Sequence, residues 1–269
     1  MKRFCVFGNP IRHSRSPQIH QLFAQQYGHS LDYQRHLASP YGFNTAVAGE
    51  FRQGLAGANV TVPFKVAAWQ LATRLSSDAM ASGAVNTLIP QSDGGLLGAN
   101  TDGLGLLHDL TRQGIELSGK RLLLLGAGGA ARGVLKNLVD ARPEVIWIAN
   151  RTTSKAASLA ARHDSVYAVN SWRDVSQPDV IINATSASLN GPLPEVPSAA
   201  FSFASVIYDM MYSQDLTPFL RQAKQCSDGI LSDGLGMLVG QAAESYALWW
   251  QCKRPEMAAV ITALRATLA

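Results

Sequence analysis

Residues 122–133 read LLLLGAGGAARG, an apolar strand that runs into a glycine-rich turn and then into helix-forming residues. Gly126, Gly128 and Ala131 occupy the three positions of the G-x-G-x-x-[G/A] pattern. In such a βα unit the glycines allow a tight turn and let backbone N–H groups approach a pyrophosphate at the N-terminus of the helix. The stretch therefore predicts a Rossmann-type dinucleotide-binding unit.

The residues after the next strand indicate which dinucleotide is bound. An NAD site usually places Asp or Glu about 20 residues beyond the glycines, where its carboxylate bonds the free ribose hydroxyl. Here the chain reads Asn150-Arg151-Thr152, and no carboxylate follows the strand. An arginine at this place favours a 2′-phosphate, so the sequence predicts NADP as the cofactor.

Composition limits the other function classes. Of the 269 residues 47% are hydrophobic and 16% charged, which is typical of a globular protein. The first residues, MKRFCVFGNP, have an apolar stretch too short for a signal sequence, and no run reaches the roughly 18 apolar residues of a membrane span. Cys5, Cys226 and Cys252 lack any C-x-x-C spacing, so we expect a cytoplasmic protein without disulfides or a metal site. The net charge of +4 comes from dispersed basic residues, which argues against a nucleic-acid partner.

The order of predicted elements indicates an α/β protein with two α/β domains and a cleft between them. The first is a mostly parallel substrate domain, residues 1–101, completed by C-terminal helices in 238–269; the second is a Rossmann-type NADP domain, residues 102–237. Strands are expected at 3–7, 31–37, 57–62, 86–89, 96–99, 121–125, 145–149, 165–169, 179–183 and 205–209. Helices are expected at 16–27, 66–75, 103–113, 130–140, 153–162, 237–250 and 256–268.

Lys65 and Asp102 are the candidates for acid/base chemistry. Lys65 follows Val62-Pro63-Phe64 where a helix should begin, and the positive end of a helix dipole disfavours a charged ammonium group. A solvated surface lysine is the alternative. Asp102 precedes an apolar helix and could simply be its N-cap. If it lies beside Lys65 instead, the carboxylate could orient the lysine and accept a bond from a substrate hydroxyl.

Neutral polar residues occur at several strand and helix ends. Ser14 and Ser16 could bind a carboxylate, although Ser16 could also cap the helix that follows Pro17. Asn59 and Thr61 alternate along a predicted strand and would share a face. Asn86 begins another strand, and Gln241 lies in an apolar helix, where an inward polar group requires partners. Together with one lysine and one carboxylate, they suit a polyhydroxylated ligand.

The same residues carry a resemblance that extends over essentially the whole chain. Nine blocks, in order, are similar to those of shikimate dehydrogenases: Ser14-x-Ser16-Pro17, 59–65 (NVTVPFK), 83–87 (GAVNT), 100–103 (NTDG), 126–131 (GAGGAA), 150–152 (NRT), 183–186 (NATS), 208–210 (YDM) and 233–241 (DGLGMLVGQ). The resemblance implies reversible, NADPH-dependent reduction of 3-dehydroshikimate to shikimate by hydride transfer, in aromatic amino-acid and chorismate biosynthesis.

The resemblance also implies roles for individual residues. Lys65 and Asp102 become the catalytic pair, with Lys65 either a proton donor or an electrostatic stabiliser. Shikimate would be held by Ser14, Ser16, Asn59, Thr61, Lys65, Asn86, Asp102, Tyr212 and Gln241. The pyrophosphate would lie on Gly126, Ala127, Gly128, Gly129 and Ala130; the 2′-phosphate on Asn150, Arg151, Thr152 and Lys155; and the nicotinamide near Met210 and Gly234.

Two alternatives stay open at this point: a quinate/shikimate dehydrogenase paralogue with relaxed substrate choice or NAD use, and a non-catalytic sensor of such ligands. The loop at 187–191 reads ASLNG, whereas family members often place a glycine earlier. Ser77 receives no role, and the sequence leaves the oligomeric state, including a homodimer, open.

Overall fold

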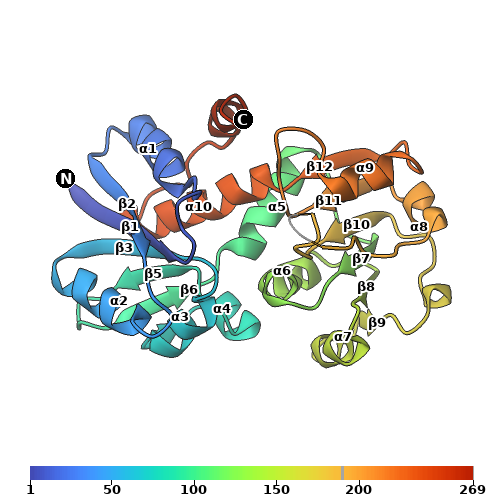
Figure 1. Cartoon of the computed structure of the whole chain (residues 1–269), viewed down its shortest axis with the longest axis horizontal. Helices are drawn as coiled ribbons and strands as arrows, with labels where there is room; N and C mark the ends of the chain where they lie inside the picture. The colour runs from blue at the N-terminus through green and yellow to red at the C-terminus, as the bar shows by residue number, and fades with distance from the viewer. Residues whose placement is uncertain (189–190, 269) are drawn as a thin grey trace. The chain divides into compact units, whose positions relative to one another are not determined.

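The computed structural model describes residues 1–188 and 191–268. It contains two compact units, which are described separately below (Figure 1). Unit 1 comprises Met1–Gly105 and Leu238–Ala266, and unit 2 comprises Leu106–Met237 with the last residues of the chain. The predicted domain ranges, 1–101 with 238–269 and 102–237, stay a prediction; in the structure Asp102 packs within unit 1.

Unit 1 contains a six-stranded sheet in the order β2-β1-β3-β5-β6-β4. Only β5 runs antiparallel to its neighbours, β3 and β6, so the sheet is mostly parallel as predicted. The antiparallel pair of β5 and β6 forms a hairpin whose connection contains Asp93-Gly94-Gly95. The strands are β1 (Lys2–Gly8), β2 (Leu31–Leu37), β3 (Leu55–Val60), β4 (Arg74–Leu75), β5 (Thr87–Pro90) and β6 (Leu96–Ala99).

Helices cover both faces of this sheet because apolar side chains of β1 point alternately to each side. Phe4 packs against Trp249 on one face, and Phe7 packs edge-on against Phe43 on the other. The first face carries α1 (Ser16–Tyr27), α10 (Leu235–Trp250) and α11 (Ala258–Arg265); the second carries α2 (Phe43–Arg52) and α3 (Lys65–Leu71), and α4 (Ser77–Ser82) lies beside β6.

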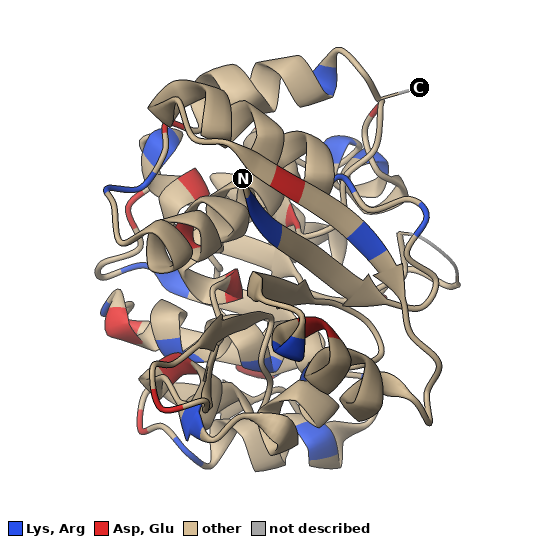
Figure 2. Cartoon of the chain, turned by 90° about the vertical axis from the view of Figure 1, so that its left-hand side faces the viewer, with Lys and Arg blue, Asp and Glu red and all other residues tan. Residues whose placement is uncertain are grey.

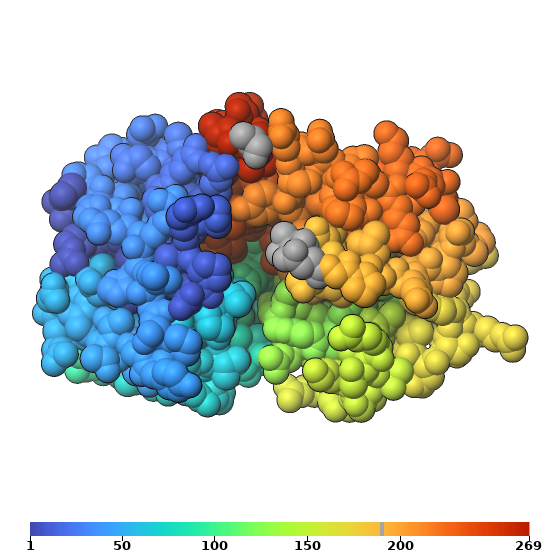
Figure 3. Space-filling model, viewed as in Figure 1, coloured from blue at the N-terminus to red at the C-terminus, as the bar shows by residue number. Residues whose placement is uncertain are grey.

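The C-terminal helices belong to unit 1, although the segment between them and the N-terminal part forms unit 2. The side chain of Gln26 exchanges two hydrogen bonds of 2.9 Å with the backbone of Glu256, and the Tyr27 hydroxyl donates to the Lys253 carbonyl. In Figure 3 the dark red C-terminal helix accordingly lies against the blue N-terminal residues. The last helices thus complete the apolar core that β1 and α1 begin.

Unit 2 is built on a fully parallel sheet in the order β12-β11-β10-β7-β8-β9. This is the strand order of a dinucleotide-binding fold, and it reverses between β7 and β10. The strands are β7 (Arg121–Leu125), β8 (Val145–Ala149), β9 (Val166–Ala168), β10 (Val180–Asn183), β11 (Val206–Asp209) and β12 (Ile230–Asp233).

The strands of unit 2 are apolar on both faces because helices cover both. Leu122 and Leu124 of β7 point into one core cluster, and Leu123 and Leu125 point into the other. The first cluster includes α5 (Asp102–Arg112), α6 (Gly129–Asp140) and α7 (Thr153–Ala160); the second includes α8 (Ser198–Phe203), α9 (Pro218–Lys224) and the short helix η1 (Trp172–Asp174).

Several predicted elements differ from the structure. The helix expected at 66–75 ends at Leu71, because the N–H of Thr73 bonds the carbonyl of Leu96 and draws the chain into the sheet. The strand expected at 57–62 spans Leu55–Val60, so Thr61 lies in the turn before α3. The sequence did not predict α2, α4, α8, α9 or β12. The described residues include no helix that is long and apolar enough to cross a membrane.

Candidate functional site

The centre of the site in unit 1 is an ion pair between Lys65 and Asp102. Lys65 begins α3 directly after the turn that follows β3, and its Nζ atom lies 2.5 Å from Oδ2 of Asp102. The lysine side chain is 30% exposed and the aspartate side chain 11%, so the pair can be reached from solvent. The N–H of Asp102 donates to the Asn100 side chain at 3.0 Å, which fixes the backbone where α5 begins.

Asn86 and Gln241 adjoin this pair. The Asn86 amide donates to Oδ1 of Asp102 at 2.7 Å, opposite the oxygen that Lys65 contacts. The same amide lies 3.4 Å from Oε1 of Gln241, whose own amide donates to the Leu238 carbonyl at 2.8 Å. The structure therefore brings together the lysine, the carboxylate and two of the predicted neutral polar residues.

Ser14 and Ser16 lie together at the start of α1. The Ser14 hydroxyl donates to that of Ser16 at 3.2 Å, and the Ser16 N–H donates back to Ser14 at 3.3 Å. Arg35 donates two hydrogen bonds, of 2.9 and 2.6 Å, to the Ser14 carbonyl. Ser16 does not cap the helix, so both hydroxyls are placed by contacts other than capping.

Asn59 and Thr61 are placed differently from each other. Asn59 is only 5% exposed, and its amide bonds other buried groups of unit 1. Thr61 is half-buried beyond the end of β3, and among the described residues no partner is recorded for its hydroxyl. The Thr61 N–H still bonds the Phe7 carbonyl of β1 at 2.9 Å, so Thr61 directly continues β3 before the turn to α3, and its place on the same face as Asn59 stays a prediction.

The glycine-rich turn in unit 2 connects β7 to α6. Gly126 adopts a φ of +107°, a conformation that favours glycine. Gly128 is the N-cap of α6 and provides no capping side chain, so the first N–H groups of the helix have no side-chain acceptor there. A Cβ atom at Gly128 or Gly129 would meet no protein atom within 4 Å. Open space in front of a helix N-terminus suits a pyrophosphate, so these residues fit a dinucleotide.

The residues after β8 form a second helix N-terminus. Asn150 accepts from the Ala127 N–H at 3.1 Å and donates to the Thr152 carbonyl at 2.8 Å, which ties this turn to the glycine-rich turn. Thr152 is the N-cap of α7, yet its hydroxyl makes no capping bond. Arg151, Thr152 and Lys155 are exposed beside this N-terminus. Two cations and a helix N-terminus together suit a phosphate group.

Met210 and Gly234 lie side by side at the ends of β11 and β12. A Cβ atom at Gly234 would collide with the backbone carbonyl of Met210, so only glycine fits at this position. The Gly234 N–H donates to the Met211 carbonyl at 3.0 Å. Tyr212 follows in the same loop and is half-buried within unit 2, whereas the other predicted substrate residues belong to unit 1.

The sequence prediction missed a buried aspartate next to Met210. Asp209 is fully buried and accepts bonds from Ser188 and Thr217, each at 2.6 Å, and from Asn183 at 3.0 Å. Burial raises the pKa of Asp209, while these hydrogen bonds oppose the shift. The resemblance included Asn183 and Asp209 within its blocks but gave them no role. Residues 189–190 of the loop at 187–191 lie outside the described residues.

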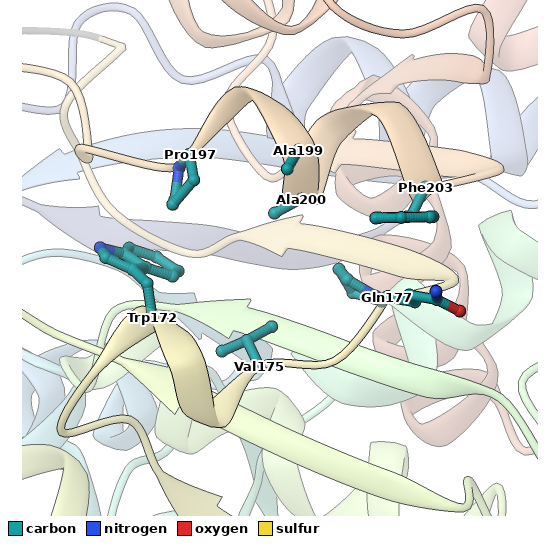
Figure 4. A pocket seen from close by; sticks show the side chains of 8 residues that line it. Trp172, Val175, Gln177, Pro197, Ala199, Ala200 and Phe203 are labelled. Atoms are coloured by element: carbon teal, nitrogen blue, oxygen red, sulfur yellow. The ribbon is translucent and has the colours of Figure 1, made fainter.

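Two hollows lie on unit 2 away from these residues, and one of them is an open depression of about 470 Å³ lined by residues 202–205 and 226–230. Figure 4 shows an apolar hollow of about 80 Å³ between η1 and α8, lined by Trp172, Pro197 and Phe203 among others. It is too small for a dinucleotide, since ligand pockets usually span about 300–1,000 Å³. Figure 2 shows basic residues interspersed with acidic ones on the face it presents. Within residues 1–188 and 191–268 no cluster of His, Cys, Asp or Glu could hold a metal ion.

The fold and site define a protein with a Rossmann-type dinucleotide-binding unit and a second α/β unit that carries a lysine–aspartate pair. Residues 6–88 match the shikimate dehydrogenase substrate binding domain, and residues 109–191 match the shikimate / quinate 5-dehydrogenase domain. The chain is 48% identical to the shikimate dehydrogenase (NADP(+)) of Pseudoalteromonas atlantica, over 100% of both chains. It belongs to the shikimate dehydrogenase family.

Solved structures agree with this assignment. An Ael1 enzyme from Pseudomonas putida has a TM-score of 0.94 and 41% identity, with 98% of both chains covered. The shikimate 5-dehydrogenase of Thermus thermophilus, solved in complex with NADP(H) and shikimate, has a TM-score of 0.89 and 33% identity over 100% of both chains.

Proposed function

We propose that this protein catalyses the reversible, NADPH-dependent reduction of 3-dehydroshikimate to shikimate, a step of the shikimate pathway. The observation that carries the proposal is the Lys65–Asp102 pair, because an ammonium group held beside a carboxylate is suited to the oxygen of a ketone that becomes an alcohol. The full-length relatives that are named shikimate dehydrogenase (NADP(+)) support the same reaction.

NADPH, when bound, supplies the hydride that reduces the ketone carbon. Lys65 holds a proton at the ketone oxygen and stabilises the charge that develops there. Asp102 keeps the ammonium group in place with one oxygen. It also accepts a bond from the neighbouring substrate hydroxyl.

We propose that neutral groups of unit 1 orient the substrate ring. The hydroxyls of Ser14 and Ser16 bind its carboxylate, and Thr61, Asn86 and Gln241 bind its hydroxyls. Tyr212 is a further candidate from unit 2. Asn59 is already bonded to buried neighbours, so we assign it a supporting role behind these residues.

The cofactor residues lie in unit 2. Gly126, Ala127, Gly128, Gly129 and Ala130 would hold the pyrophosphate, because the N-terminus of α6 has no side-chain cap and the space at Gly128 and Gly129 is open. Arg151, Thr152 and Lys155 would bind the 2′-phosphate, and Asn150 would position the turn that carries them. Met210 and Gly234 would lie near the nicotinamide.

An absorbance assay at the nicotinamide band tests the proposal directly. The protein is mixed with shikimate or quinate, and with NADP or NAD, in all four combinations. We expect the highest kcat/KM for shikimate with NADP. A higher value for quinate or for NAD would overturn the assignment of substrate or cofactor, and binding of both ligands without turnover would overturn the enzymatic role.

We also propose a cytoplasmic location, which the three unpaired cysteines support. The protein is isolated in buffer without reductant and denatured, and its thiols are then labelled. We expect three reactive thiols per chain. Two thiols missing from that count would indicate a disulfide and contradict the proposal.

A further inference from the structure

Behind the Lys65–Asp102 pair lies a cluster of buried polar side chains, of which only Asn86 binds the substrate in the proposed mechanism. Its members are 5% exposed or less: Asn59, Asn86, Thr87, Thr101 and Ser245. Burying hydroxyl and amide groups costs free energy unless each finds a hydrogen-bond partner. The cluster comes from four separate segments of unit 1, so the arrangement of these partners is a property of the tertiary structure.

The orientation of the Asn86 amide follows from two partners that can act in only one way. The backbone N–H of Thr101 can only donate, and it lies 3.0 Å from Oδ1 of Asn86. The Asp102 carboxylate accepts at 2.7 Å from Nδ2. The amide oxygen of Asn86 therefore faces the buried cluster, and its N–H group faces the catalytic carboxylate.

The same reasoning fixes the proton of Thr87. Its hydroxyl lies 2.8 Å from Oδ1 of Asn86, an atom that can only accept, so Thr87 donates to Asn86. The hydroxyl of Ser245 lies 2.7 Å from that of Thr87 and 3.0 Å from the Gln241 carbonyl, so its single proton has two acceptors, of which Thr87 is the nearer. Ser245 in turn accepts from Nδ2 of Asn59 at 3.0 Å.

Asn59 closes the chain at its far end. Its Nδ2 also donates to the backbone carbonyl of Asn86 at 3.1 Å, so Oδ1 must be the atom that faces Tyr33 and His20. The Tyr33 hydroxyl donates to this oxygen at 2.7 Å, and Nε2 of His20 lies 3.2 Å from it. Asn59 also donates directly to the Thr87 hydroxyl at 3.3 Å, so donors on Asn59, Thr87 and Asn86 follow one another toward Asp102.

We propose that Thr87 and Ser245 are positioning residues for the reaction, acting through the Asn86 amide on the Asp102 carboxylate. Hydrogen bonds that run in one direction polarise one another, so a bond accepted by Oδ1 of Asn86 strengthens the bond that its N–H donates. The Thr101 N–H, which can only donate, keeps the amide from turning over, because the reversed amide would present its own N–H group to this donor. This inference rests on the proposed function.

The test compares two substitutions at one position. Thr87→Val keeps the shape and removes the hydroxyl, whereas Thr87→Ser keeps the hydroxyl. For shikimate oxidation we expect Thr87→Val to lower kcat by about 3- to 10-fold, which is the effect of one neutral hydrogen bond. Thr87→Ser should keep most of the wild-type kcat. Ser245→Ala should lower kcat in the same direction. The Kd for NADP, measured by titration, should not change in any of the three variants.

A merely structural role is separated from the proposed one in two ways. Ser232→Ala removes a buried hydroxyl of unit 2 that accepts a bond from Gln113 at 2.9 Å. It should lower the melting temperature about as much as Thr87→Val does, but it should leave kcat unchanged. In a double-mutant cycle, Thr87→Val should cause no further fall in an Asn86→Ala background, because Thr87 acts through Asn86.

The outcomes distinguish this inference from the proposed function. An inactive wild-type protein would overturn the proposed function. With an active wild type, the inference is overturned if Thr87→Val is as active as wild type, if Thr87→Ser is as impaired as Thr87→Val, or if the two losses in the cycle multiply. If Thr87→Val does not fold, Ser245→Ala replaces it in the double-mutant cycle with Asn86→Ala.

Discussion

The Nζ atom of Lys65 donates a 2.5 Å hydrogen bond to Oδ2 of Asp102 across 37 positions of sequence. Lys65 begins α3, Asp102 begins α5, and both elements start at the edge of the same sheet. The pairing explains how a lysine is tolerated at a helix N-terminus, where the helix dipole disfavours it: the carboxylate supplies the compensating charge.

Removing the ammonium group tests the catalytic assignment. Lys65→Met retains much of the side-chain volume, and we expect kcat to fall by at least about 100-fold, since acid/base groups contribute about 10²–10⁴. Steady-state kinetics with shikimate and NADP measure the change. Lys224→Met, at an exposed position of α9, is the matched control and should behave as wild type. A fall of less than about tenfold for Lys65→Met would show that the lysine is not catalytic.

Arg151 is expected to select NADP over NAD. Arg151→Ala should raise the KM for NADP by about 10-fold or more, because a hydrogen bond to a charged group contributes about 1.5–3 kcal/mol. The KM for NAD should hardly change, since NAD lacks the 2′-phosphate. Arg162→Ala, exposed just beyond α7, serves as the control. Equal effects on the two cofactors would contradict the phosphate contact.

Two glycines of unit 2 should respond oppositely to alanine. A Cβ atom at Gly128 meets nothing, so Gly128→Ala should keep the melting temperature and weaken NADP binding by about tenfold. A Cβ atom at Gly234 collides with the Met210 carbonyl, so Gly234→Ala should lower stability by about 1–3 kcal/mol. Thermal unfolding and NADP titration measure both effects. Destabilisation by Gly128→Ala would mean that the open space is needed by the protein itself.

His20 should make the protein less stable in acid. Burial lowers its pKa from 6.5 to about 3, so between these values the unfolded chain binds a proton that the folded protein does not. Stability therefore falls as the pH drops below 6.5, by about 2 kcal/mol at pH 5 from this group. The titratable groups that face His20 are Tyr33 and Tyr246, and burial raises the pKa of both.

Urea unfolding at pH 7 and pH 5 measures this contribution. The loss of stability should be smaller by about 2 kcal/mol in His20→Gln than in wild type, whereas His13→Gln, in an exposed loop, should match wild type. An equal loss in wild type and His20→Gln would show that His20 is not the group responsible.

Local patterns determined the elements that carry the site. The glycine-rich turn at 126–131 and the apolar strand before it act within a few residues, so the sequence alone predicted β7, the start of α6 and the pyrophosphate site. The sequence did not predict short helices such as α8 and α9, because they are too short for apolar residues to repeat visibly at helical spacing. The end of β3 was misplaced because strand pairing with β1, and not the alternation of residue types, decides where the ladder stops.

The sequence by itself determined that a Rossmann-type unit exists, and through its ordered motifs it indicated the family and the residues of the site. The tertiary structure decided which alternative held for Asp102, whose carboxylate bonds Lys65 and Asn86 instead of capping α5. It also placed Thr87, Ser245 and Asp209 in buried hydrogen-bond networks, which no motif had indicated. Capping and turn formation are local and can be read along the chain. The direction of a buried hydrogen bond depends on partners from distant segments, and only the folded chain brings these together.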